Sequence, residues 1–235
     1  MSQTDAAVDL IRSRIIGLNL EPGSRIDEPL LIKTFKLGRT PAREAINRLV
    51  AEGFVNIVPN RGGTYVRKLD LREIGEIVVA HQLAETVLGQ LCQLEDPTLA
   101  DDLEGMHQKY IVEVEKRSFL NITAINEEFH LRMHKSIGNT FFFEFARSTH
   151  RHVRRLLVFL YKLEEAEPNY LREQFDLNVK QHEAIIEAIR KRDRDFLRDF
   201  MPKHARFTQQ RLMRLLEGKA IEPFSLNLWS GPAPT

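Results

Sequence analysis

Two pairs of residues in the second half of the chain have the spacing of a metal site. Asn126 and His130 are four residues apart, so both side chains would project from one face of a helix. His182 and His204 flank the charged run 190–193, and in an antiparallel helical hairpin each would lie about 15 Å from the turn. These two imidazoles would lie at one level, and with the Asn126 and His130 pair from another helix they could form a site for zinc, nickel or another borderline divalent cation.

The remaining histidines leave other arrangements open. His134 is also four residues from His130 and could pair with it, although we expect it to face elsewhere. His150 and His152 lie in the basic run 147–155, which predicts solvated surface positions for both. A histidine on an apolar helical face is more often a hydrogen-bonded core residue than a metal ligand. An effector bound directly by the histidines, without a metal, is therefore an alternative.

A second group of polar residues has the pattern of a DNA-reading surface. Residues 42–49 contain an apolar stripe at helical spacing, which predicts a buried face and an opposite, outward face. The outward face carries Arg39, Thr40, Arg43 and Asn47. The first turns of a recognition helix reach base edges in the major groove, and arginine paired with guanine is the commonest specific contact. We expect Arg43 to contact a base, and Arg39 and Thr40 to contact bases or phosphates.

Three short helices are predicted around this surface. Apolar spacing indicates one helix over about 5–18 and a second that begins near Asp27, with the turn residues of 21–24 between them. The third is predicted to begin at Thr40, because threonine is a good N-cap and Pro41 suits the first helical position.

A basic hairpin is predicted directly after the third helix. Residues 55–59 and 64–66 are rich in β-forming side chains, and NRGG at 60–63 provides the turn. Arg61 and Gly62 at its tip are expected to lie at the minor groove, because glycine lets the backbone approach closely. The order helix, turn, helix and basic hairpin is that of a winged helix-turn-helix DNA-binding fold.

The rest of the chain has helical periodicity without a strand pattern. The predicted helices cover 72–94, 97–118, 121–138, 140–164, 168–192 and 193–217. The fold class is therefore mainly α, with a winged helix-turn-helix at 1–68 followed by an all-α antiparallel helical bundle at 69–217. The tail 218–235 is rich in glycine, proline and serine and is expected to be extended or disordered.

Charge and cysteine content narrow the function classes. Residues 1–68 carry 11 Lys and Arg against 7 Asp and Glu, a net +4, whereas 69–235 carry 23 against 26, a net −3. A basic head on a mildly acidic body suits DNA binding, because phosphate neutralisation supplies much of the affinity. The single Cys92, the absence of a signal sequence and the absence of a long apolar run predict a cytoplasmic protein without membrane spans.

Residues 6–66 resemble the DNA-binding head of the GntR family of bacterial transcriptional regulators. That head carries a Pro-Gly turn, an R-x-P-x-R-E-A motif and an N-R-G run, which match Pro22-Gly23, RTPAREA at 39–45 and Asn60-Arg61-Gly62. Two positions depart from the pattern. Gly38 stands where the family usually has serine or threonine, and Pro29 stands where some members place an arginine that reaches DNA.

Residues 71–217 resemble the FCD effector domain of the FadR-type branch of this family. In its metal-binding members, Asp-x-x-x-His and two later histidines hold a divalent metal at the floor of a ligand cavity. The resemblance implies the same role for His130, His182 and His204, with Asn126 in place of the aspartate. Members often also carry an arginine that faces a carboxylate ligand from the first effector helix. His81 stands at that position, so the resemblance implies that His81 and Glu85 contact the effector.

The motifs and the resemblance together predict a sequence-specific regulator that binds double-stranded operator DNA as a homodimer. Its helical domain would bind a small-molecule effector, an organic acid or related metabolite, beside a divalent metal such as zinc or nickel. The alternatives are the same regulator without metal and, less favoured, a metal-dependent enzyme. The sequence contains no HExxH, P-loop or Gly-x-Ser-x-Gly motif, so we expect no catalytic residues.

Overall fold

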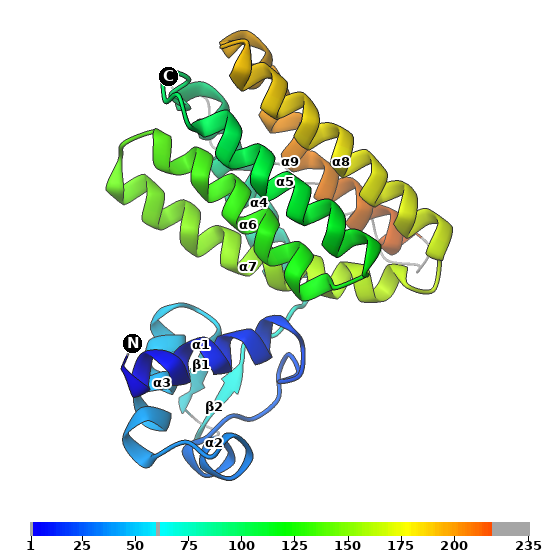
Figure 1. Ribbon diagram of the computed structural model, residues 1–235. Coiled ribbons are helices and arrows are strands. Elements are labelled where there is room, and N and C mark those ends of the chain that lie inside the picture. Colours follow the sequence, from blue (N-terminus) through cyan, green and yellow to red (C-terminus); the bar gives the residue numbers. More distant parts are fainter. Residues whose placement is uncertain (1, 60–61, 218–235) are drawn as a thin grey trace, which may run out of the picture.

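The computed structural model describes residues 2–59 and 62–217 of the 235-residue chain. It contains a small N-terminal head and a larger helical bundle, which lies above the head in Figure 1. The mainly α fold class, with a winged helix-turn-helix before a helical bundle, is confirmed. Arg61 and the tail 218–235, for which the sequence made predictions, lie outside the described residues. None of the described helices combines the length and apolar composition that a bilayer crossing requires.

The head consists of three helices and one hairpin. Its elements are α1 (Gln3–Ile16), α2 (Glu28–Phe35), α3 (Arg39–Ala51), β1 (Val55–Val58) and β2 (Gly63–Val66). The two strands are antiparallel, with Val55 opposite Val66 and Val58 opposite Gly63. The predicted start of the third helix at Thr40 was wrong, because α3 begins at Arg39 and its N-cap is Gly38. Gly38 offers no side-chain oxygen for a cap, so the N-cap rule pointed to the nearest threonine.

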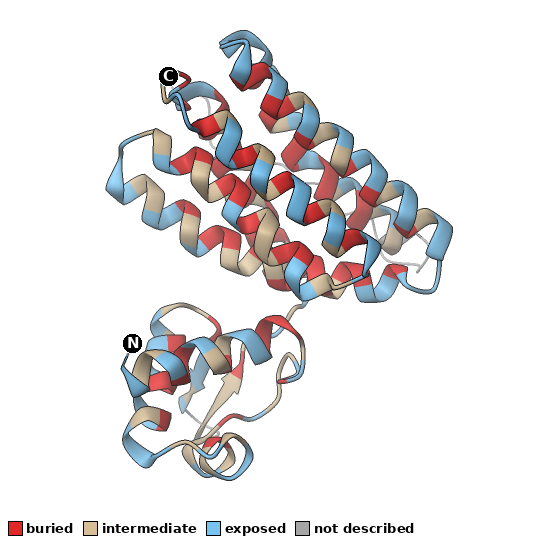
Figure 2. Cartoon of the chain, viewed as in Figure 1, coloured by how far each residue is buried: buried red, intermediate tan, exposed pale blue. Residues whose placement is uncertain are grey.

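The bundle contains six helices in the part of the chain that the structure describes. They are α4 (Leu71–Leu91), α5 (Leu99–Glu115), α6 (Phe119–Ser136), α7 (Thr140–Glu164), α8 (Pro168–Arg190) and α9 (Arg194–Glu217). Their order matches the prediction, and most ends differ by a few residues, as helix ends commonly do. In Figure 2, buried residues form stripes along each helix and exposed residues cover the outside. Each helix thus buries one apolar face in the bundle.

Helices α4 and α9 approach each other closely. A Cβ atom added to Gly89 of α4 would lie 2.8 Å from the backbone oxygen of Leu197 in α9, which is too close for a larger residue. Glycine therefore allows the two backbones to pack at this point. A turn of α4 nearer the N-terminus also contacts α9, because the Gln82 side-chain amide donates a hydrogen bond to Gln209 Oε1 at 2.6 Å.

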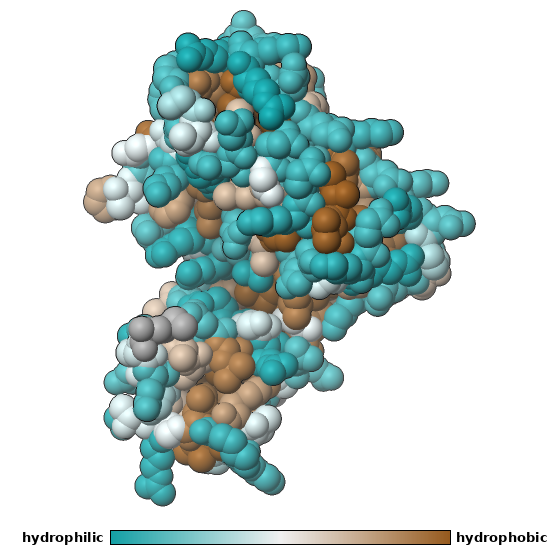
Figure 3. Space-filling view, in the orientation of Figure 1, coloured by the Kyte–Doolittle hydropathy of each residue, from teal (hydrophilic) through white to brown (hydrophobic). Residues whose placement is uncertain are grey.

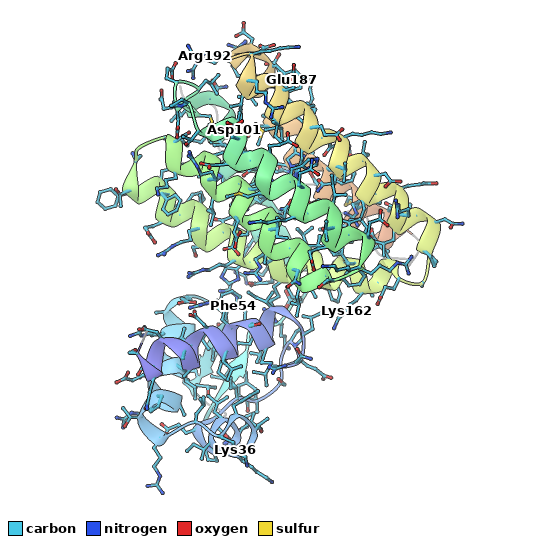
Figure 4. All side chains as sticks on the ribbon, in the orientation of Figure 1. Lys36, Phe54, Asp101, Lys162, Glu187 and Arg192 are labelled. Carbon is cyan, nitrogen blue, oxygen red and sulfur yellow. The ribbon has the colours of Figure 1, made fainter. Side chains whose placement is uncertain are left out.

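Helix α7 packs against the head, and it forms the lower edge of the bundle in Figure 1. Val158 of α7 belongs to the apolar core of the head, although the rest of that core comes from residues 7–66. The Lys162 ammonium donates a hydrogen bond to the Gly17 carbonyl oxygen at 3.1 Å. Figure 4 shows Lys162 at the bundle edge that faces the head.

Candidate functional site

Helix α3 presents the polar face that the sequence predicted. Arg39, Thr40, Arg43 and Asn47 are all exposed. The opposite stripe, formed by Ala42, Ala45, Ile46 and Leu49, is buried in the head. Apolar burial therefore fixes the rotation of α3 and turns the polar residues to solvent.

The arginines on this face are available to a partner. Within the described part of the chain, Arg39 and Arg43 take part in no ion pair, whereas Arg48 lies 2.8 Å from Asp5. The turn before α3 includes Lys36, which has a left-handed backbone with φ of 56°. Lys36 lies at the end of the head that is farthest from the bundle in Figure 4. This end of the head can therefore approach a partner without the bundle intervening.

At the tip of the hairpin, the structure describes Gly62 but not Arg61. Gly62 is exposed and has a φ of 58°, a conformation that favours glycine. Arg61 lies outside the described residues, so its role at the minor groove stays a prediction.

Three histidines from three helices meet inside the bundle. His130 of α6, His182 of α8 and His204 of α9 are all buried, and each offers a ring nitrogen within 4.8 Å of the other two. The Nε2 atoms of His130 and His204 are 3.3 Å apart. The hairpin argument from sequence therefore placed His182 and His204 at the correct level. Asn126, one turn before His130, is half-buried and lines the same small cavity, whose volume is about 20 Å³.

Hydrogen bonds on the far side of two rings identify their tautomers. His204 Nδ1–H donates to Gln181 Oε1 at 2.7 Å, and His130 Nδ1–H donates to Glu85 Oε2 at 2.8 Å. With its proton on Nδ1, the uncharged form of each ring has a lone pair on Nε2, and the two Nε2 atoms face each other. Two facing lone pairs repel each other, and either a proton on one nitrogen or a cation between the two removes that repulsion. This arrangement fits a divalent metal ion.

His182 gives independent support for a metal. Both of its ring nitrogens are buried and have no hydrogen-bond partner among the described residues. Burial, followed by the neighbouring imidazoles of His204 and His130, holds the pKa of His182 well below its ordinary value. Burial likewise lowers the pKa of His204 to about 3. Both rings are therefore neutral at pH 7, which is the form that binds metals.

The carboxylate of Glu85 contacts the three-histidine group through the Nδ1 atom of His130. Glu85 is fully buried and accepts hydrogen bonds from three histidines: from His130 on Oε2, and from His134 and His150 on Oε1, each at 3.0 Å. The pKa of Glu85 is held well below its ordinary value because these hydrogen bonds and the adjacent imidazole of His130 outweigh the effect of burial. His81, one turn before Glu85, is also buried, and burial lowers its pKa to about 3. Polar groups from α4, α6 and α7 therefore form one continuous network.

Comparison with known proteins agrees with this architecture. Residues 3–66 match the family model "Bacterial regulatory proteins, gntR family", and residues 77–207, more than half of the chain, match the model "FCD domain". The chain belongs to the GntR family. It is a transcriptional regulator whose helical part is an FCD domain, as the sequence motifs had indicated.

Individual relatives share the fold at low sequence identity. This GntR-family chain is 27% identical to the Gluconate operon transcriptional repressor of Bacillus licheniformis, over 80% of this chain and 75% of that protein. It is 23% identical to the Nta operon transcriptional regulator of Aminobacter aminovorans, over 90% and 95%. The solved structure of E. coli McbR/YncC has a TM-score of 0.70 at 21% identity and covers 93% of this chain and 99% of its own.

The solvated positions predicted for His150 and His152 were wrong, whereas His134 lies outside the group of His130, His182 and His204, as expected. His134 and His150 are fully buried, and His152 is half-buried against the head. The basic run 147–155 belongs to an amphipathic helix, and His150 lies on the same stripe as the buried Val153 and Leu157. A local excess of arginine therefore gave no information about which side of α7 faces inward.

His152 has a structural role at the junction of the two parts. Its Nε2–H donates to the Glu52 carbonyl oxygen at 2.9 Å, and its ring stacks on Phe54 with 4.3 Å between ring centroids. Glu52 is the C-cap of α3, and Phe54, labelled in Figure 4, lies at the top of the head. The histidine network and the end of α3 are thus joined through two residues of α7, His150 and His152.

One residue that lines the cavity was not predicted from the sequence. Arg211 of α9 is buried, lines the same cavity as His130 and His204, and forms a two-pronged ion pair with the buried carboxylate of Glu164. The signal was present in the sequence, because residues 204 and 211 are two helical turns apart and share a face. His81 also lines this cavity. The effector-binding roles of His81 and Glu85 stay predictions.

Proposed function

We propose that this GntR-family regulator binds operator DNA through the exposed face of α3 and responds to a small organic acid that binds beside a divalent metal in the bundle. The main support for the metal is that the Nε2 atoms of His130 and His204 face each other at 3.3 Å, beside the buried His182, whose ring nitrogens have no hydrogen-bond partner among the described residues. Arg39 and Arg43 support the DNA-binding part, because they are exposed and form no ion pair among the described residues.

The metal would be held by His130, His182 and His204, with Asn126 as a neutral oxygen donor. When bound, it would supply a Lewis acid to which the carboxylate of an effector can bind. Asn126 brings no charge, unlike the aspartate of the metal-binding members that the sequence resembles. Glu85 supplies a negative charge through its hydrogen bond to His130 Nδ1–H, which fixes the ring and raises its basicity as a ligand. Zinc and nickel both suit this nitrogen-rich set.

The effector would enter beside Arg211. The cavity of about 20 Å³ holds roughly one water molecule, so an organic acid must displace side chains to enter. Arg211 borders the cavity and makes its two hydrogen bonds to Glu164 through Nε and one terminal nitrogen. Its other terminal nitrogen can donate a hydrogen bond to the carboxylate of the effector. Arg211 would then replace the arginine that related domains carry at the position of His81.

Helix α7 would transmit the change to DNA. A ligand shifts an equilibrium only if it binds one arrangement more tightly than the other. Displacement around His130 reaches His150 through Glu85, and His152 on the same helix contacts the end of α3. In a homodimer, a change in the two heads would alter their fit to two half-sites of a near-palindromic operator. We also propose that the protein is cytoplasmic, because it has a single cysteine and no long apolar run. The resemblance of residues 71–217 supports its place in the FadR-type branch.

The testing experiment combines metal analysis with operator binding. The purified full-length protein is stripped with a chelator, reloaded with Zn²⁺ or Ni²⁺, and screened against small organic acids by thermal shift and by binding to a selected operator. We expect metal-dependent stabilisation by an acid and a change in operator affinity. His204→Gln should abolish the metal dependence and leave metal-free DNA binding unchanged.

Two outcomes would replace this proposal. Stabilisation by an acid that is equal with and without metal would favour histidines that bind the effector directly, an alternative supported by the uncharged Asn126. A selected pool of duplexes with no common sequence would contradict the operator-binding role of α3. We propose no enzymatic activity, and turnover of any tested acid by the metal-loaded protein would contradict that view.

A further inference from the structure

A second group of ligand atoms lies beside the three-histidine site and is distinct from it. Glu85 Oε1 is 3.0 Å from His134 Nε2 and 3.0 Å from His150 Nε2, and the two nitrogens are 3.3 Å apart. The three side chains come from α4, α6 and α7, and all are at most 1% exposed. None of them belongs to the group formed by His130, His182 and His204.

The spacing of these three atoms matches one face of a tetrahedral metal site. With metal–nitrogen and metal–oxygen bonds of about 2.0–2.1 Å, tetrahedral angles place neighbouring ligand atoms about 3.3 Å apart. The measured separations are 3.0, 3.0 and 3.3 Å. Without a metal, both Nε2 atoms must carry protons to donate to the same oxygen, so two like partial charges face each other. One divalent cation in place of these protons would bind all three atoms and remove the repulsion.

Charge balance also favours a cation at this position. Within the described part of the chain, Glu85 forms no ion pair with lysine or arginine, and its partners are the three histidines. A buried carboxylate without a compensating charge is costly. A divalent ion would supply a compensating charge and use the imidazoles as ligands.

We propose that Glu85, His134 and His150 form a second divalent-metal site, with His81 as the fourth ligand. His81 precedes Glu85 by one helical turn, and its ring nitrogen lies within 4.8 Å of the ligand atoms of Glu85 and His150. Two imidazoles or more with one carboxylate suit zinc or a similar borderline ion. His81 also lines the cavity, so it is the ligand that an incoming acid can displace.

The two sites would be linked through the carboxylate of Glu85. Its Oε1 atom would bind the second metal, while its Oε2 atom accepts the hydrogen bond from His130 Nδ1–H. Occupancy of the second site would withdraw negative charge from this hydrogen bond and so weaken His130 as a ligand of the first metal. The second site is inferred from its own geometry and does not depend on the proposed effector response.

The test is the number of Zn²⁺ ions bound by the chelator-treated full-length protein, measured by competition with a chromophoric chelator and by elemental analysis after gel filtration. We expect two ions per chain for the wild type. His150→Gln should bind one, and His204→Gln, which removes a ligand of the first site only, should also bind one. His152→Gln is the matched control, because it lies on the same helix outside both groups, and it should bind two.

Each result decides between the sites. One ion in the wild type, unchanged in His150→Gln and lost in His204→Gln, would overturn the second site and retain the first. One ion lost in His150→Gln and kept in His204→Gln would support the second site while contradicting the metal in the proposed function. His134→Gln repeats the test if His150→Gln does not fold. No bound ion in the wild type would overturn both sites and leave Glu85 as a purely structural acceptor.

Discussion

The exposed face of α3 and the histidine network of the bundle use polar residues in opposite ways. On α3, Arg39 and Arg43 are solvated and form no ion pair among the described residues, so their charges are available to a partner from solution. In the bundle, Glu85 and the surrounding histidines are buried and have one another as partners. On the face that Figure 3 shows, hydrophilic residues dominate the bundle and apolar patches are visible on both parts.

The difference has an energetic consequence. Substitution of a solvated side chain removes a contact with a partner and leaves folding unchanged, because water replaces what is lost. Substitution in a buried network leaves other polar groups without partners, so it costs stability as well as function. The two regions should therefore respond differently to the same kind of mutation.

The largest effect is expected for Glu85→Gln in the metal-free protein. The amide removes the charge and turns a donor towards histidine N–H groups, which should lower the free energy of unfolding by about 3 kcal/mol. Urea denaturation of chelator-treated protein measures this change. Glu76→Gln on the same helix is the control: its carboxylate is half-exposed beside Arg72, and we expect a loss below about 1 kcal/mol. Equal losses in both variants would refute the structural role of the network.

A smaller effect, confined to DNA, is expected for Arg43→Ala. Loss of a base contact should reduce discrimination between operator and random duplex by about 1–3 kcal/mol, with unchanged thermal stability. Binding-site selection followed by titration of the selected and random duplexes measures both quantities. Arg48→Ala is the matched control on the same helix, because Arg48 pairs with Asp5. Arg43 has no base-reading role if its variant selects the same sequence as the wild type.

The smallest effect is expected at the contact between the two regions. His152→Ala removes the hydrogen bond to the Glu52 carbonyl and the stacking on Phe54. The ratio of operator affinities with and without Zn²⁺ should move towards one by up to about tenfold, which corresponds to roughly 1.4 kcal/mol of coupling. Fluorescence anisotropy with a labelled operator measures the ratio. An unchanged ratio would show that the signal does not pass through this contact.

The same contrast explains how far the sequence could lead. The outward face of α3 follows from its apolar stripe, since burial of Ala42, Ile46 and Leu49 determines where Arg43 points. The approach of His182 and His204 follows from equal distances to a turn. Both predictions depend on local periodicity, which sequence records directly.

The second histidine group could not be predicted in this way. His134 and His150 lie on helices whose rotation is set by packing against the rest of the bundle, and the arginines around His150 suggested a solvated surface. Their burial becomes understandable only when Glu85 is seen between them. A carboxylate from α4 that gathers side chains of α6 and α7 is a tertiary feature, and spacing within one helix does not reveal it.

The small volume of the bundle cavity has a kinetic consequence. A space of about 20 Å³ does not admit an organic acid, so the bundle must open before a ligand can enter. The observed rate of association should then level off at high ligand concentration, at the rate of opening. Dissociation would require the same opening of the bundle. The lifetime of the bound ligand would therefore be set by the opening rate of the bundle.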